Sequence, residues 1–285
     1  MNARLLLLAM LLTVLLFFLP FAQVVTYPFL IFSTFIHETS HALTAVLTGG
    51  RVDSLIVRLN GSGVTYTRGG IQFLISSAGY IGTTLFGGIL LVVSRRKEHV
   101  RGALYACALL VSIVTALFVG HTNNVLVLGL LGATGALMAI SRAELRRPGG
   151  ATNKSRFYLP AIGLFFLGTL IVYLVMTGSL FSWASGLIII LSLLAVARFA
   201  SLNFAHFFVT FLSVQCSLNA LDAIKTVYFL SLRSACANDA ASMTAITGLP
   251  AWIWALLWAF LSLTILAISA AIYARGNFRP LAIPA

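Results

Sequence analysis

The sequence predicts an all-α, multi-pass membrane protein of about nine transmembrane helices, with a small β-hairpin after the second helix. Of its 285 residues, 60% are hydrophobic and only 8% are charged, whereas about a quarter of the residues in a soluble domain are charged. Apolar runs of membrane-spanning length follow one another along the chain. We therefore expect the core of the protein to be an intramembrane helix bundle.

A helix needs about 17 to 25 predominantly apolar residues to cross a bilayer. Runs of this kind occupy residues 5–25, 28–48, 71–93, 102–119, 124–140, 157–177, 180–200, 203–230 and 250–274. The first run is about 20 residues long, whereas the apolar core of a signal peptide has about 7 to 15. We expect this run to be the first span. A run that crosses only half of the bilayer is permitted where protein surrounds it.

Residues 51–70 interrupt the helical pattern and predict a β-hairpin. Two stretches rich in β-branched residues flank the turn Asn60-Gly61-Ser62-Gly63, and such a turn is typical of two antiparallel strands. One interpretation is an exposed connecting loop. The other is a strand edge that lines a site, where an extended peptide could add as a further strand.

The basic residues follow membrane topology rather than nucleic-acid binding. The formal net charge is +12, from 18 Lys and Arg against 6 Asp and Glu, and most of these cations lie in short connections. If nine spans alternate in direction, twelve of the 18 cations fall on one side. The positive-inside rule then places the connections at 94–101 and 141–156 in the cytoplasm and the N-terminus outside. We expect no nucleic-acid partner.

Two histidines and a glutamate lie in the apolar sequence FIHETSHAL. On a helix, His37 and His41 are one turn apart on the same face, and Glu38 is about 60° from His41 around the axis. Two imidazoles in this arrangement can bind one zinc ion, while the carboxylate reaches a water on the metal and moves its proton. The alternative is a structural histidine pair with a buried glutamate. Ionisable groups at bilayer depth are costly and usually functional, which favours the metal site.

Catalytic zinc usually has three protein ligands and one open position. Three acidic residues lie in predicted loops among basic residues, where a solvated surface is the simpler interpretation: Asp53, Glu98 and Glu144. Asp222 lies within a predicted span and is the favoured third ligand, with Asp239 as the alternative. Lys225, three residues after Asp222, could instead form an ion pair with it, and Asp239 could instead cap the following turn.

The motifs together resemble the site-2 protease class of intramembrane zinc metallopeptidases, in particular its short bacterial and plant-type branch without a PDZ domain. The resemblance covers HETSHALTAVLTGG, GRVDSL, GSGVTYTRGG and SSAGYIGTTLFGGILL within residues 31–93. It returns at residues 216–260 with NALDAI, NDA and TGLP. Between these two regions only the hydrophobicity is similar.

The resemblance implies that His37 and His41 are zinc ligands, that Glu38 is the catalytic acid and base, and that Asp222 is the third ligand. Better-known members have LDG where this chain has Leu221-Asp222-Ala223. This departure keeps Asp239 as the alternative, because NDA is similar to an SDA element of the short branch.

The resemblance also implies one transmembrane metallopeptidase domain over residues 1–285, with its catalytic core in 28–93 and 203–274. The implied activity is hydrolysis of membrane-spanning protein substrates within a lipid bilayer, here a bacterial inner or plasma membrane. Two other hypotheses remain open. One is a metal- or proton-coupled transporter, and the other is an inactive relative that binds membrane partners. The sequence does not predict the oligomeric state.

Overall fold

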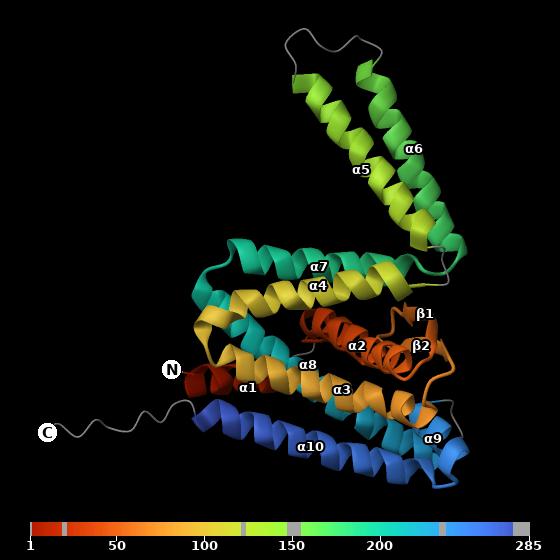
Figure 1. The fold of residues 1–285 in the computed structure, drawn as a ribbon. Helices are drawn as coiled ribbons and strands as arrows, with labels where there is room; N and C mark the ends of the chain where they lie inside the picture. Colours follow the sequence, from red (N-terminus) through yellow and green to blue (C-terminus); the bar gives the residue numbers. More distant parts are fainter. Residues whose placement is uncertain (1, 19–21, 121–123, 147–154, 234–237, 276–285) are drawn as a thin grey trace, which may run out of the picture.

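Long helices make up most of the fold, and a short antiparallel hairpin packs against several of them (Figure 1). A computed structural model describes residues 2–18, 22–120, 124–146, 155–233 and 238–275. The elements in chain order are α1 (Asn2–Phe18), α2 (Ala22–Leu47), β1 (Arg51–Val57), β2 (Gly63–Arg68), α3 (Gln72–Ser94), the 3₁₀ helix η1 (Lys97–His99), α4 (Val100–Phe118), α5 (Asn124–Arg146), α6 (Ser155–Met176), α7 (Leu180–Phe199), α8 (Leu202–Arg233), α9 (Asp239–Thr247) and α10 (Ala251–Arg275).

Every predicted apolar run contains a long helix, but the predicted boundaries differ most near the N-terminus. The second run was expected to begin at Pro28, whereas α2 begins at Ala22 and contains Pro28. Pro20 lies in the sequence between α1 and α2. The short helix α9 was not predicted, because its sequence is too short and too polar to give a clear helical period.

The all-α membrane class is supported, but the expectation of nine spans is not confirmed. Among the described residues, six helical segments are long and apolar enough to cross a membrane: 72–94, 97–118, 124–143, 180–199, 202–232 and 251–275. Helix α1 has only 17 residues. Helix α2 has 26 residues, but His37, Glu38 and His41 lower its hydropathy. The residues that suggest a site are therefore the same ones that weaken the evidence for this span.

The predicted hairpin forms, and its turn lies where the sequence places it. Gly61 has a left-handed φ of +84°, a conformation that favours glycine. The Asn60 side chain accepts a hydrogen bond from the Ser62 backbone N–H at 3.1 Å, as is common in tight turns. Within the described residues the sheet contains only β1 and β2. The outer edge of β2 has no strand partner there, whereas Leu55 of β1 forms a single parallel bridge with Val119.

The outer edge of β1 is covered by α4 and α7. The Leu55 carbonyl accepts a hydrogen bond from the backbone N–H of Gly120, just after α4, at 2.7 Å. The Ser182 hydroxyl on α7 lies 2.9 Å from both the N–H and the carbonyl oxygen of Val57. These contacts satisfy backbone groups that lipid could not. The hairpin is therefore part of the helix bundle rather than an exposed loop.

The second strand and the turn before it lie along α2. The Thr34 hydroxyl approaches the carbonyl oxygen of Gly61 at 2.8 Å. Further along, the Thr65 hydroxyl approaches the Glu38 carbonyl oxygen at 3.1 Å. Strand β2 therefore runs beside the helix that carries the two histidines.

Helices α3, α8, α9 and α10 pack together on another side of the site. Their buried side chains form one hydrophobic cluster, made of Tyr80, Ile224, Val227, Ala240, Met243, Trp254, Ala255 and Trp258. This cluster attaches the short helix α9 to three long helices. By contrast, α5 and α6 form a hairpin that extends away from the other helices (Figure 1).

The basic connection between α3 and α4 lies at the end of the bundle opposite the β-hairpin (Figure 1). Arg95 donates to the carbonyl oxygen of Ile272 in α10 at 3.2 Å. Arg101 donates to the carbonyl oxygen of Ala200, just after α7, at 3.1 Å. Arg95 and Arg101 therefore neutralise carbonyl groups at helix C-termini at this end of the bundle.

Candidate metal centre

Helix α2 presents His37 and His41 on one face. The spacing of four residues puts the two imidazoles one turn apart. Their Nε2 atoms lie 3.1 Å apart, and the ring planes meet at 75° with centroids 4.8 Å apart. The structure therefore brings together the two nitrogen donors that the HETSH spacing predicts.

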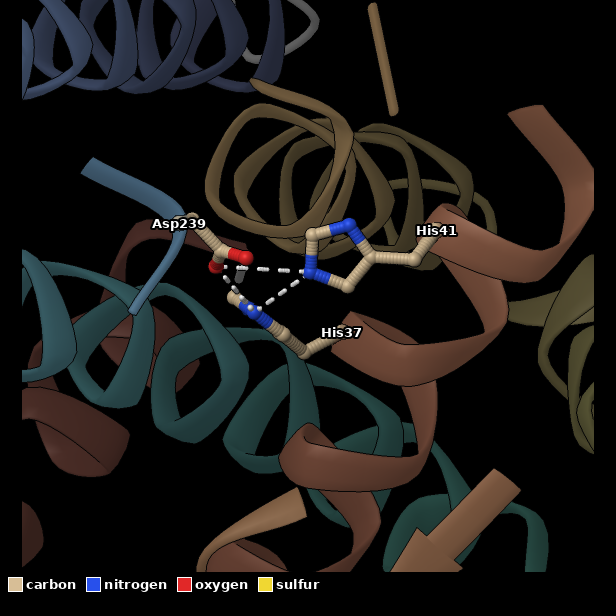
Figure 2. A group of neighbouring side chains, drawn as sticks. All are labelled: His37, His41 and Asp239. Carbon is tan, nitrogen blue, oxygen red and sulfur yellow. Dashed lines mark hydrogen bonds and ion pairs between the residues drawn. The ribbon is translucent and has the colours of Figure 1, made fainter. Parts of the chain in front are cut away.

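A carboxylate from the far end of the sequence completes the cluster. Oδ2 of Asp239 lies 3.5 Å from Nε2 of His37 and 3.4 Å from Nε2 of His41. Figure 2 shows the carboxylate and the two imidazoles pointing toward one another from separate segments of the chain. Their three ligand atoms all lie within 4.8 Å of one another. Within the described ranges, this is the one group of three or more side chains that could bind a metal ion together.

The local structure of α9 explains why the Asp239 side chain is available. The cap of this helix is Asn238, whose side-chain oxygen accepts a hydrogen bond from the N–H of Ala241 at 2.9 Å. Asp239 is the next residue and need not cap the helix itself. Gly248, with a φ of +74°, ends the helix in the left-handed conformation typical of C-terminal caps. Asp239 therefore does not cap this helix, which was the alternative to metal binding that its place in the sequence allowed.

The structure does not bring the favoured Asp222 to the histidines. Its side chain is 65% exposed on α8 and forms an ion pair with Lys225, three residues further along the same helix. This is the alternative that the i, i+3 spacing allowed. Asp222 lines the same cavity as the histidines, but the carboxylate that meets both imidazoles is that of Asp239. The preference for Asp222 over Asp239 is therefore corrected.

The donor atoms fit a zinc ion in both chemistry and spacing. In a tetrahedral site with metal–ligand distances of about 2.0–2.1 Å, neighbouring ligand atoms lie about 3.3 Å apart. The distances among the two Nε2 atoms and the carboxylate oxygen are 3.1, 3.4 and 3.5 Å. Two imidazole lone pairs and an anionic oxygen at these distances repel one another unless a cation or proton lies between them.

The surroundings of His41 favour metal binding through Nε2. Its Nδ1 lies 2.6 Å from the carbonyl oxygen of Ile75. Because a carbonyl oxygen can only accept, Nδ1 carries the proton and neutral His41 keeps a lone pair on Nε2. Gly79 faces the two imidazoles and has no side chain that could clash with them. A Cβ at this position would lie only 2.3 Å from Nε2 of His37 and 2.5 Å from Nε2 of His41.

Asp239 is held in its charged form by the same neighbours. Burial opposes its ionisation, but when the imidazoles are protonated, the charge of His41 and the hydrogen bonds from both histidines hold the pKa of the Asp239 carboxyl well below its ordinary value. The carboxyl group is therefore deprotonated at neutral pH, as a metal ligand must be.

Glu38 lies beside the cluster but outside the ligand set. The residue is only 4% exposed, and its Oε2 accepts a hydrogen bond from the Thr65 hydroxyl at 2.7 Å. A Cβ on Gly63 would lie only 2.4 Å from Oε1 of Glu38, so the glycine makes room for the carboxylate. Both Glu38 and the two histidines line one cavity.

This cavity has a volume of about 1020 Å³ and is bounded by the hairpin, α2, α3, α8 and α9. Its polar lining includes side chains from all five of these elements: Thr34, Ser62, Thr65, Gln72, Asn219, Asn238 and Ser242. A pocket with polar groups and candidate metal ligands inside an apolar bundle is the kind of place where a reaction with water can occur.

Tyr80 and Trp258 are site residues that sequence reasoning missed. The Tyr80 ring meets the His37 ring at 75° with centroids 4.7 Å apart, and stacks on Trp258 at 5.0 Å. Tyr80 also lines the cavity together with Asp239, close enough for its hydroxyl to interact electrostatically with that carboxylate. One tyrosine in an apolar helix carries no pattern that indicates such a role. Only the packing of α3 against α2, α9 and α10 places it there.

Replacing Tyr80 with phenylalanine removes the hydroxyl near Asp239 and is expected to weaken zinc binding about 10- to 100-fold, the usual effect of losing an outer partner of a metal ligand. The aromatic contacts with His37 and Trp258 remain in this variant. Competition with a chelator of known zinc affinity measures the change. Tyr105→Phe, at an exposed position on α4, is the matched control. Equal zinc affinity of Y80F and Y105F would contradict a role for the Tyr80 hydroxyl.

Fold and site together define an apolar helix bundle with a candidate metal centre in one internal cavity. Residues 7–147 and 149–269 match the family model described as Peptidase M50B-like. The chain therefore belongs to this peptidase family, in agreement with the resemblance to site-2 proteases, and the family indicates a membrane metallopeptidase. No curated protein and no solved structure matches the chain significantly.

Proposed function

We propose that the protein is a zinc-dependent endopeptidase that hydrolyses peptide bonds of membrane-embedded protein substrates. The observation that carries this proposal is the convergence of His37, His41 and Asp239 at one point of the cavity. Glu38 follows His37 directly on the same helix and faces the same cavity. Two imidazoles and a carboxylate leave one position of a tetrahedral zinc ion open, as hydrolytic zinc sites do.

The three ligand residues would hold zinc through Nε2 of each histidine and Oδ2 of Asp239. When bound, zinc lowers the pKa of a water molecule and polarises the scissile carbonyl group. Glu38 would take a proton from the attacking water and deliver it to the leaving amine, as a general base and then a general acid. Its burial beside the ligands keeps this carboxylate close to the reacting atoms.

The hairpin supports an extended substrate in this cavity. A transmembrane helix hides its carbonyl groups in hydrogen bonds to residues four positions further along, so a substrate must unwind locally before hydrolysis. Among the residues that the structure describes, strand β2 has no strand partner on its outer edge, and residues 63–65 of this strand line the cavity. An unwound segment could replace its helical hydrogen bonds by pairing with this edge.

The charge distribution supports an orientation for this enzyme. The basic connection between α3 and α4 lies at the end of the bundle opposite the hairpin (Figure 1). By the positive-inside rule this end would face the cytoplasm. The cavity would then open nearer the other surface of the membrane, which in the proposed setting is a bacterial inner or plasma membrane.

Zinc removal tests the proposed function directly. The purified protein is expected to contain about one zinc per chain and to cleave a tagged single-pass protein in liposomes. Treatment with 1,10-phenanthroline should stop cleavage, and added zinc should restore it. His37→Ala is expected to lose both zinc and cleavage, whereas His99→Ala, at an exposed position in η1, should keep both. Cleavage by a zinc-free protein would contradict the proposal.

The transporter hypothesis predicts a different result in the same liposomes. Ion or proton flux would depend on His37 and would survive the loss of the Glu38 carboxylate. Flux without cleavage would therefore favour a transporter. Crosslinking to a substrate without turnover would favour an inactive relative that only binds membrane partners.

A further inference from the structure

We propose that Thr65 of strand β2 is a positioning residue for Glu38, so that the strand expected to receive the substrate also sets the position of the catalytic carboxylate. This inference rests on the proposed function and assigns a role within the same site. It depends on three observations: the hydrogen bonding of Glu38, the contact with Gly63, and the attachment of the hairpin to the helices behind it.

Thr65 is the one side chain that donates a hydrogen bond to the Glu38 carboxylate among the residues with described positions. Its hydroxyl lies 2.7 Å from Oε2 and 3.1 Å from the Glu38 carbonyl oxygen. A hydroxyl has one proton to donate. The shorter distance and the negative charge of the carboxylate favour Oε2, because hydrogen bonds to charged acceptors are the stronger ones.

Gly63 restricts the same carboxylate from a second direction. It lies two residues before Thr65 on the same strand, so both residues face the same side of the hairpin. The space where a Gly63 side chain would begin is occupied by Oε1 of Glu38, only 2.4 Å from the ideal Cβ position. One carboxylate oxygen is therefore hydrogen-bonded to β2, and the other packs against its backbone.

The hairpin is attached to the bundle directly across from Thr65. Its partner in the antiparallel register is Leu55, which is fully buried and accepts the hydrogen bond from Gly120 at 2.7 Å. A continuous set of contacts thus connects the end of α4, β1, β2 and Glu38. Strand β2 cannot shift along α2 without moving either this attachment or the carboxylate.

The experiment compares Thr65→Val, Thr65→Ser and Thr39→Val with wild type, using cleavage of the tagged single-pass protein in liposomes. Valine removes the hydroxyl and keeps the shape and strand propensity of threonine. Thr39 is the matched control, because it lies next to Glu38 but bonds its hydroxyl to the carbonyl oxygen of Phe35, at 2.6 Å, within its own helix. Zinc content, kcat and KM are measured for each protein.

We expect T65V to contain as much zinc as wild type and to have a KM within about twofold of the wild-type value. Its kcat should fall about 10- to 100-fold, the scale on which a misplaced catalytic group slows a reaction. T65S should recover most of the rate because it restores the hydroxyl, and T39V should resemble wild type. A purely structural role would instead lower zinc content or stability and would leave the kcat of the intact fraction unchanged.

The outcomes separate this inference from the proposed function. A wild-type protein without zinc or cleavage overturns both. An active wild type beside a T65V variant with unchanged kcat overturns the role of Thr65 alone. If T65V loses its zinc, the Gly63→Ala variant tests the inference instead. Its added methyl group must displace the Glu38 carboxylate while the Thr65 hydroxyl is kept. A G63A variant with zinc and wild-type kcat overturns the inference, and one with zinc and a kcat at least 10-fold lower supports it.

Discussion

Replacing Glu38 with glutamine is expected to reduce peptide hydrolysis by about 10²- to 10⁴-fold, the usual contribution of general acid–base catalysis. Glutamine has nearly the same size and can still accept the hydrogen bond from Thr65 through its amide oxygen. It cannot take a proton from water. The variant should therefore keep its fold and about one zinc per chain while losing turnover, as measured by metal analysis beside cleavage in liposomes.

The matched control for this prediction is Glu98→Gln, which makes the same change at an exposed residue of η1. We expect wild-type cleavage from E98Q. Full turnover by E38Q would show that the carboxylate has no catalytic role, and flux that persists in E38Q without any cleavage would favour a transporter. Loss of zinc from E38Q would indicate that Glu38 is a ligand, contrary to the geometry around Asp239.

The second large effect is expected from Asp239→Asn, because it removes the carboxylate that meets both histidines. An amide is a much poorer zinc ligand than a carboxylate, so zinc affinity should fall by more than about 100-fold. This is a larger loss than the one expected when a residue that only hydrogen-bonds a metal ligand is removed. After dialysis against a weak chelator, D239N should contain little zinc and show no cleavage.

Asp222→Asn is the matched comparison for D239N. This change removes an exposed ion pair with Lys225, and exposed pairs contribute only about 0.2–1 kcal/mol to stability. We expect D222N to keep its zinc. Because Asp222 lines the cavity, a moderate change in KM is compatible with its position. Zinc retained by D239N and lost by D222N would restore Asp222 as the third ligand.

Several features could be predicted because they depend on neighbouring residues. The spacing of His37 and His41 fixes their common face on any helix. The turn at Asn60 and Gly61 predicts the hairpin, which forms with strands on either side of it. The long apolar runs predict helices, and each run contains one. The number of membrane spans was less certain, because the polar residues of the site make α2 less apolar than an ordinary span.

The third ligand could not be chosen from the sequence. Asp222 and Asp239 are both carboxylates in the late part of the chain, and hydropathy favoured the one inside an apolar run. The structure places Asp222 on an exposed face of α8 and begins a short helix at Asp239, with Asn238 as its cap. The cap and the attachment of α9 to the cluster around Trp258 are what direct the Asp239 carboxylate to the histidines.

The sequence by itself determined the membrane class, the paired imidazoles with their neighbouring glutamate, and the hairpin that follows them. Each of these follows from composition or from local backbone geometry. Only the tertiary structure decided that Asp239 completes the cluster, that Tyr80 packs against His37, and that Thr65 hydrogen-bonds Glu38. These contacts join segments far apart in the chain, and their positions depend on how α2, α3, α9 and the hairpin pack, which no local pattern specifies.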